Sequence, residues 1–157
     1  MTGDQVVKRI TEVGVAVRDL EAATALLVDL LGGEAGPVVE VELYTMRFRM
    51  VRVGKVDFEL MEPTAPSGVI HDFLTRRGEG LHHIAFAVDD LADTMANLAA
   101  KQVAWVDPEP MANVMPVTDY AGRTFTDGEI RFAFTQPKSI LGILFEFIQY
   151  PEGFQTP

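Results

Sequence analysis

The chain has 157 residues, of which 48% are hydrophobic, and it carries a formal net charge of −10. This length and composition suit one folded domain, or two small fused ones, with an ordinary hydrophobic core. The acidic balance argues against nucleic acid as the main partner, because phosphate contacts need clustered Lys and Arg. Since the chain has no cysteine, a disulfide framework and thiolate metal ligands are excluded.

The apolar runs are too short to span a bilayer, and the beginning, MTGDQVVKRI, has no signal-peptide core. We therefore expect a cytoplasmic protein without a membrane partner. No glycine-rich phosphate loop, serine nucleophile elbow or HExxH motif is present.

The first half of the chain predicts a strand, a helix and three further strands. A strand is expected over 9–17, and a helix over 20–31 that Asp19 caps and that Gly32 and Gly33 end. The three strands are expected over 38–44, 46–53 and 56–62. A connector over 64–80 follows, with a short helix that begins after Ser67 as its N-cap and stops at Gly78.

The second half predicts the same order of elements. A strand is expected over 81–88, then a helix to about residue 101 that Asp89 or Asp90 caps. Strands are expected over 103–106, 130–135 and 142–150. The segment 107–128 contains Pro, Asp and Gly and is long for a loop, which is typical of a functional or mobile segment.

The two halves also resemble each other in sequence. ITEVGVAVRDLEA (10–22) aligns with LHHIAFAVDDLAD (81–93), so that Glu12 falls on His83. FELMEP (58–63) resembles FEFIQYP (145–151), so that Glu59 falls on Glu146. The repeat predicts a single α+β domain over 1–157 with two tandem βαβββ modules, at about 8–63 and 81–151.

These four polar residues occupy related positions on the predicted strands. If the halves pair about a pseudo-twofold axis, strand alternation allows Glu12, Glu59, His83 and Glu146 to meet in one cleft. One imidazole and three carboxylates suit a divalent cation with an open coordination position, which can polarise a carbonyl oxygen. The alternative is four unrelated charged residues at strand edges.

At these residues the sequence resembles the vicinal oxygen chelate superfamily, which contains glyoxalases, bleomycin-resistance proteins and extradiol dioxygenases. RRGEGLHHIAFAVDDL, FELMEP and QPKSILGILFEFIQYP are most similar to the signatures of methylmalonyl-CoA epimerases. The resemblance implies paired βαβββ modules that form a cup-shaped sheet around one divalent metal site, commonly within a homodimer. It implies Glu12, Glu59, His83 and Glu146 as the metal ligands.

The resemblance is incomplete at three residues. Glu12 and Gln136 stand where the family usually has histidine, and Phe48 stands where an epimerase has one of its two bases. His83 is preferred to its neighbour His82 as a ligand because it is the one in register with Glu12. We expect His82 to be packed or hydrogen-bonded on the other face of the strand.

The expected function is a metal-dependent isomerase, epimerase-like, or a lyase. It would act through the enolate of an acyl thioester or related carbonyl substrate, with Glu146 or Glu12 as the general base. The cation would be Co, Mn, Mg or Zn, since Glu12 makes the site harder than one with a second imidazole. Substrate-binding candidates are Arg47, Arg49, Lys138 and Tyr120.

Two other functions fit the same fold. One is a metal-free ligand-binding or resistance protein, in which the cup holds a ligand without chemistry. The other is a cyclase or dehydratase of specialised metabolism, in which the acids move protons and the segment 107–128 closes as a lid.

Overall fold

The computed structural model describes residues 6–156. Residues 1–5, which begin the segment MTGDQVVKRI, and residue 157 lie outside the described residues. The chain divides into two compact units. One unit is Glu12–His83, and the other joins the segment up to Thr11 to Ile84–Thr156. We call them the 12–83 unit and the 84–156 unit. The boundary falls inside strands β1 (Arg9–Ala16) and β5 (Gly80–Ala87). No helix among residues 6–156 is long and apolar enough to cross a membrane.

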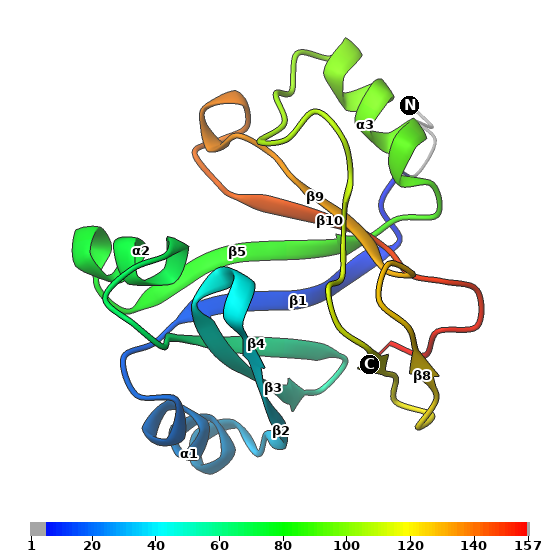
Figure 1. Cartoon of the computed structure of the whole chain (residues 1–157). Helices are drawn as coiled ribbons and strands as arrows, with labels where there is room; N and C mark the ends of the chain where they lie inside the picture. The colour runs from blue at the N-terminus through cyan, green and yellow to red at the C-terminus, as the bar shows by residue number, and fades with distance from the viewer. Residues whose placement is uncertain (1–5, 157) are drawn as a thin grey trace. The chain divides into compact units, whose positions relative to one another are not determined.

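The 12–83 unit is a mixed sheet with two α-helices (Figure 1). Its strand order is β2-β3-β4-β1, with β4 parallel to β1 and antiparallel to β3. The elements after β1 are α1 (Leu20–Leu31), β2 (Glu34–Val41), the 3₁₀ turn η1 (Glu42–Tyr44), β3 (Met46–Val53), β4 (Val56–Pro63) and α2 (Val69–Arg77).

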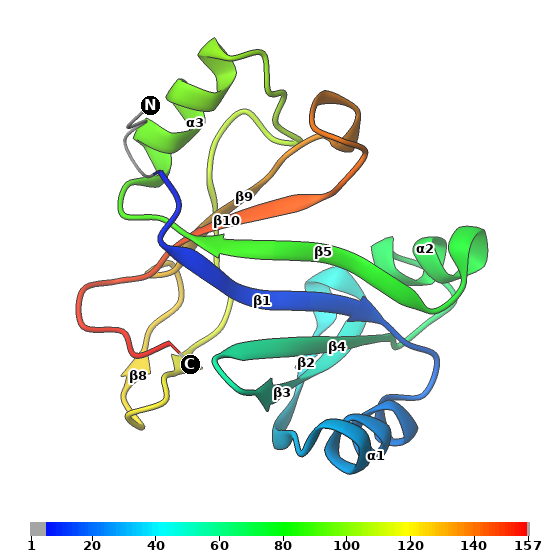
Figure 2. The ribbon, with the colours of Figure 1, turned by 180° about the vertical axis from the view of Figure 1, so that it is seen from behind.

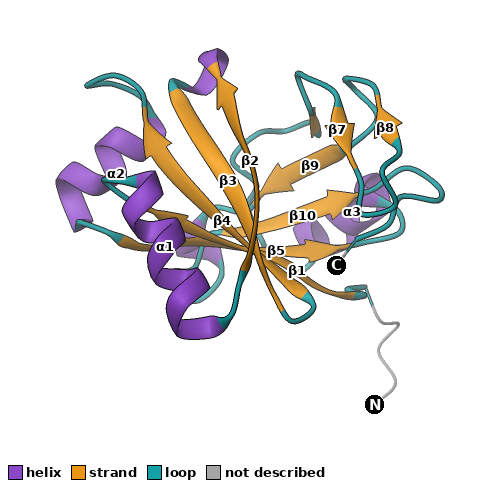
Figure 3. Ribbon diagram, turned by 90° about the horizontal axis from the view of Figure 1, so that it is seen from below, coloured by secondary structure: helices purple, strands orange, loops and turns teal. Residues whose placement is uncertain are grey.

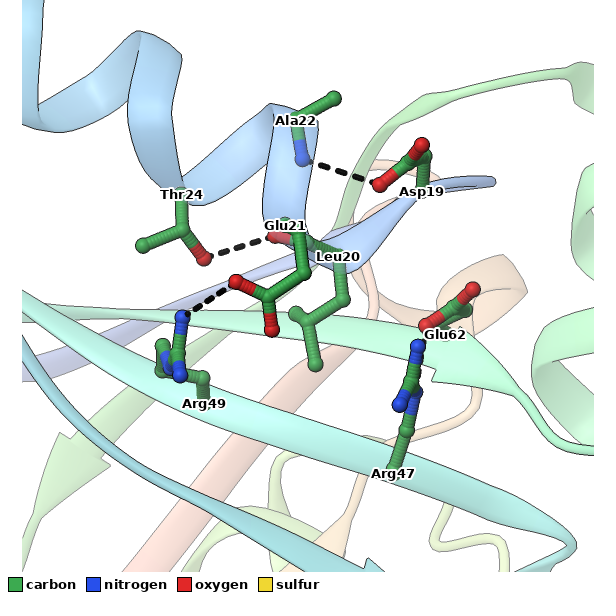
Figure 4. Close-up of polar contacts among 8 residues, drawn as sticks. All are labelled: Asp19, Leu20, Glu21, Ala22, Thr24, Arg47, Arg49 and Glu62. Carbon is green, nitrogen blue, oxygen red and sulfur yellow. Dashed lines mark hydrogen bonds and ion pairs between the residues drawn. The ribbon is translucent and has the colours of Figure 1, made fainter.

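Helix α1 begins and ends as its sequence predicts. The Asp19 carboxylate accepts a hydrogen bond from the Ala22 amide at 2.9 Å, as an N-cap does (Figure 4). Gly32 ends the helix with φ of 66°, a left-handed conformation that glycine adopts without strain. Asp90 caps α3 (Leu91–Ala100) in the same way through the Asp93 amide, so the choice between Asp89 and Asp90 falls on Asp90.

Alternate residues of the strands in this unit pack against different helices. Leu60 and Val51 form an apolar cluster with Leu20 of α1. Ala16 and Met61 cluster instead with Ile70 and Leu74 of α2. Because side chains alternate across a strand, α1 and α2 pack on opposite faces of the sheet in this unit (Figure 3). Leu60 therefore points toward α1.

The strands of the 84–156 unit have the order β5-β10-β9-β6. Figure 2 shows β5, β10 and β9. Strand β10 runs parallel to β5 and antiparallel to β9. After β5 its elements are α3, β6 (Met111–Ala112), the hairpin β7 (Val117–Thr118) and β8 (Thr124–Phe125), β9 (Arg131–Phe134), the 3₁₀ turn η2 (Pro137–Ser139) and β10 (Phe145–Gln149). Apart from the inserted hairpin, this is again a βαβββ order.

Helix α3 covers one face of the strands in this unit. Phe147 is buried with Leu91 and Met95 of the helix, and Phe145 packs against the same cluster. Both phenylalanines therefore point toward α3. By alternation Glu146 lies on the opposite face, which it shares with Ile148.

The predicted strand over 103–106 is wrong. Only Trp105 forms an isolated bridge, with Thr135, while the Val103 amide bonds to Leu98 and the Ala104 amide to the Ser139 hydroxyl. Pro108 and Pro110 follow and lack the amide that a longer ladder requires. Strand β6 is instead the first of the three strands that follow the helix in the βαβββ order.

Two predicted boundaries also need correction. Strand β2 runs over Glu34–Val41 rather than 38–44, and residues 42–44 form the turn η1. Ser67 does not cap α2, because the N-cap is Gly68 with φ of 95° and no side-chain hydrogen bond. A side chain there would meet Tyr44 O at 3.1 Å, so close packing explains the glycine.

Asp119 anchors the segment 107–128 through hydrogen bonds and an ion pair. Its carboxylate accepts hydrogen bonds from the backbone amides of Ala121, Arg123 and Gln155, and pairs with the Arg123 guanidinium at 3.1 Å. Burial of this carboxyl acts to raise its pKa, but these hydrogen bonds outweigh the burial and lower the pKa of Asp119. The segment is therefore anchored to the C-terminal residues of its own unit.

Candidate functional site

Three of the four predicted ligands lie in the 12–83 unit and share one face of its sheet. Glu59 on β4 is the register partner of Gly14 on β1, and Glu12 lies two residues from Gly14. The His83 Nε2 atom is 3.4 Å from Glu59 Oε2, and a carboxylate oxygen of Glu12 lies within 4.8 Å of a ring nitrogen of His83. His83 is 3% exposed and the Glu59 side chain 13%, so the group is shielded from bulk water.

The His83 ring lies directly over Gly14. A Cβ atom built on Gly14 would lie 2.2 Å from His83 Cε1 and 2.3 Å from Nδ1, closer than non-bonded atoms approach. Gly14 is thus required by the space that the imidazole occupies. Glycine is the one residue that allows the ring to lie against the strand.

His82 makes a hydrogen bond to the ligand candidate beside it. The Nδ1 atoms of His82 and His83 are 2.9 Å apart, and the His82 ring also packs edge-on against Phe73. Burial first, and the neighbouring His83 second, lower the pKa of His82 to about 4, so this ring is neutral at pH 7. The expectation of a packed or hydrogen-bonded histidine is confirmed.

Asp57 is a carboxylate on the same face that the sequence analysis missed. It is the register partner of Glu12 on β1 and of Arg52 on β3, and it is 6% exposed. Its position two residues before Glu59 on a strand was the signal that could have found it. The candidate site face of this unit therefore has three acidic residues, one imidazole and the guanidinium of Arg52.

Besides Arg52, strand β3 presents the apolar side chains of Phe48 and Met50 to this face. Phe48 pairs with Met61 and Met50 pairs with Glu59, so both lie on the Glu59 side of the sheet. Phe48 packs against the cluster of Met61, Ile70 and Leu74. Neither side chain can accept a proton.

Glu146 occupies the corresponding place in the 84–156 unit. It lies on β10 between Ala85 of β5 and Phe134 of β9, and it is 7% exposed. The neighbours on its face include Ala85, Ile148 and Phe132, which belong to one apolar cluster. A carboxylate in such surroundings needs a partner, because an isolated buried charge is costly.

Arg47 and Arg49, predicted to bind substrate, lie on the α1 face of the sheet in the 12–83 unit (Figure 4). Arg47 Nε is 2.6 Å from Glu62 Oε2, and Arg49 Nη1 is 3.2 Å from Glu21 Oε2. The hydrogen bond and the charge of Glu62 raise the pKa of Arg47. Arg49 pairs across the strands with Leu60, on the face opposite Glu59.

The other two substrate-binding candidates lie in the 84–156 unit. Lys138 is exposed on the turn η2, and Tyr120 is 43% exposed beside the hairpin β7–β8. Gln136, which replaces a histidine of the family pattern, donates through its side-chain amide to Trp105 O at 3.0 Å. This hydrogen bond holds the residue before the turn η2, which carries Lys138, against Trp105.

The donors of the 12–83 unit suit a divalent cation. A buried imidazole nitrogen and two nearby carboxylates, with Asp57 beside them, are the N and O donors that Mn, Co, Zn or Mg accept. Without a cation, carboxylates this close repel one another. The side chains present therefore fit the cofactor that the family resemblance implies.

Comparison with known proteins gives the same family. Residues 11–118 match the model of the Glyoxalase/Bleomycin resistance protein/Dioxygenase superfamily. An uncharacterized protein, YqjC, of Bacillus subtilis is 29% identical over 94% of this chain and 95% of its own length. The mitochondrial methylmalonyl-CoA epimerase of Mus musculus is 29% identical over 64% of this chain, a stretch that spans 57% of the mouse protein.

Solved structures agree with the sequence comparison. A Streptomyces coelicolor methylmalonyl-CoA epimerase, in complex with 2-nitronate-propionyl-CoA, superposes with a TM-score of 0.76 at 27% identity. The match covers 92% of this chain and 98% of that one. The α+β prediction is confirmed, and the chain belongs to the Glyoxalase/Bleomycin resistance protein/Dioxygenase superfamily, with methylmalonyl-CoA epimerases among its relatives.

Proposed function

We propose that the protein is a metal-dependent enzyme that removes the proton next to the carbonyl of an acyl-CoA thioester. The observation that carries the proposal is the group of Glu12, Glu59 and His83 on one face of the 12–83 unit. The relatives named as methylmalonyl-CoA epimerases support the substrate class.

In this proposal Glu146 joins the other three residues as a ligand or as the base. Glu146 is the register partner of Ala85, and Ala85 lies two residues after His83 on the continuous strand β5. Side chains two residues apart on a strand point to the same face, which supports a common site. The homodimer expected from the family stays a prediction.

Each group then has one chemical task. A bound divalent cation would supply the positive charge that stabilises a carbonyl oxygen as it becomes negative. Glu146 accepts the α-proton on a carboxylate oxygen, while the C–H electron pair delocalises onto the thioester carbonyl. The apolar residues around Glu146 keep water away from that proton. Glu12 takes the role of base if Glu146 binds the cation.

The phosphate or carboxylate groups of the substrate would be bound by residues other than the cation ligands. Lys138 and Tyr120 are exposed and are proposed to contact phosphate or carboxylate groups of the substrate. The role predicted for Arg47 and Arg49 requires their ion pairs with Glu62 and Glu21 to open.

One observation supports a second candidate besides an epimerase. Phe48 and Met50 are the β3 residues beside Met61 and Glu59 on the site face, and neither can return a proton. An enzyme with a single base suits elimination or ring closure from the enolate as well as it suits exchange. A cyclase or dehydratase is therefore our second candidate.

The test is α-proton exchange in D₂O with methylmalonyl-CoA and propionyl-CoA. We expect deuterium at the α-carbon when the protein is loaded with Mn or Co. Exchange should stop after treatment with a chelator and return when the metal is added back. Exchange that persists at full rate without metal, or is absent in the loaded protein with both substrates, would refute the proposal. Chiral analysis of the recovered thioester separates epimerisation from exchange on one face.

A further inference from the structure

The two adjacent histidines of β5 form a pair in which only one direction of hydrogen bonding leaves His83 able to bind a cation. Their Nδ1 atoms are 2.9 Å apart and their rings are nearly perpendicular, at 87°. The His82 ring is held from a second side by Phe73, with ring centroids 5.0 Å apart. Both imidazoles are therefore fixed in orientation by contacts within the 12–83 unit.

A hydrogen bond between two Nδ1 atoms needs one N–H and one lone pair. A neutral imidazole carries a single proton, so the proton that one ring places at Nδ1 is absent from its Nε2. If His82 donates, the His83 proton lies on Nε2, where Glu59 Oε2 at 3.4 Å attracts it. If His82 accepts, His83 carries its proton at Nδ1 and its Nε2 lone pair is available.

We propose that His82 is a positioning residue that accepts the Nδ1–H of His83 and so presents the His83 Nε2 lone pair to a divalent cation. This inference rests on the cation site of the proposed function. In the cation-free protein the bond runs the other way, and His83 Nε2–H faces the Glu59 carboxylate. Both rings thus exchange tautomers together when the cation is bound, with no net gain or loss of protons.

Replacement of His82 by another aromatic residue distinguishes this role from simple packing. A histidine that merely filled space would tolerate replacement by another aromatic ring, since its contact with Phe73 is edge-on. A hydrogen bond that orients a ligating histidine fixes both its tautomer and its ring direction. Loss of such a bond typically weakens metal affinity by about 10- to 100-fold.

The variants His82→Phe and His82→Asn separate the two roles. His82→Phe keeps an aromatic ring without an acceptor, and we expect its Zn²⁺ affinity by calorimetry to fall about 10- to 100-fold. His82→Asn keeps an oxygen near the position of Nδ1 and should recover most of the affinity. His71→Phe is the matched control, because His71 lies on α2 and contacts Asp72 rather than His83. Equal affinity of His82→Phe and the parent protein would overturn the inference.

The tautomers can be read directly, because the chain has three histidines. In protein labelled with ¹⁵N at histidine, two-bond ¹H–¹⁵N spectra should show His83 protonated at Nε2 without Zn²⁺ and at Nδ1 with Zn²⁺. His82 should change in the opposite sense, while His71 does not change. Zn²⁺ binding with His82 still protonated at Nδ1 would refute the inference and leave the proposed function intact. A parent protein that binds none of Zn²⁺, Mn²⁺ and Co²⁺ would refute both.

Discussion

Gly14→Ala is expected to weaken divalent-cation binding by roughly 100-fold, the upper end of what displacing the support of a ligand costs. The new Cβ would lie 2.2, 2.3 and 2.8 Å from three atoms of the His83 ring, so the imidazole must move away from Glu12 and Glu59. Gly14 lies in a regular strand, and alanine fits that backbone. The substitution therefore acts through His83 rather than through strain in β1. Calorimetric titration with Mn²⁺ measures the effect.

Gly36→Ala is the matched control for this change. Gly36 lies on β2 of the same unit, where the nearest atom to a new Cβ is Met50 O at 3.4 Å. We expect its Mn²⁺ affinity to equal that of the parent protein. Unchanged affinity in Gly14→Ala would show that His83 does not bind the cation from the position it occupies over Gly14.

Glu146→Gln is expected to reduce α-proton exchange by about 10²- to 10⁴-fold, the usual contribution of a general base. Glutamine keeps the size of the side chain and an oxygen that can bind a cation, but it does not accept a proton at neutral pH. The measurement is the initial rate of deuterium incorporation into an acyl-CoA by the Mn-loaded variant. Metal content should be measured on the same sample, so that loss of cation and loss of base are separated.

Two further variants interpret that result. Glu152→Gln, at an exposed position of the same unit, should exchange at the parent rate. If Glu12→Gln loses exchange while Glu146→Gln retains both exchange and cation, the base is Glu12 and the assignment to Glu146 is wrong.

The internal repeat was the most informative part of the sequence. It paired Glu12 with His83 and Glu59 with Glu146, and it predicted the βαβββ order of both halves, because strand alternation and helix caps are local properties. Asp19 and Asp90 cap their helices as expected. The opposite faces of Leu60 and Glu59, and of Phe147 and Glu146, also follow from alternation alone.

The failures are features that depend on other parts of the chain. The sequence of segment 103–106 is typical of a strand, but its amides donate hydrogen bonds to α3 and to Ser139. The sequence alone does not show whether these amides bond to a neighbouring strand or to such groups. Gly68 rather than Ser67 precedes α2 because Tyr44 O and Thr45 lie close to it. The hydrogen bond between His82 and His83 joins neighbours that an ideal strand would turn to opposite faces.

The arginines of β3 show a different limit. Arg47 and Arg49 were expected to bind an anionic substrate because they are basic and lie on a strand. Alternation alone places them opposite Phe48 and Met50, yet it does not say which face a helix covers. Their partners Glu62 and Glu21 come from β4 and α1, and these pairings appear only in three dimensions (Figure 4).

The central proposal is that Glu12, Glu59 and His83 hold one divalent cation, with Glu146 as a fourth ligand or as the base. Its most direct test is the metal content of the purified protein by elemental analysis, after chelation and dialysis against Mn²⁺ or Co²⁺. The account predicts one ion per chain, and less than a tenth of that in His83→Ala, with His71→Ala unchanged. A parent protein that retains no ion, or a His83→Ala variant that retains a full ion, would contradict the account.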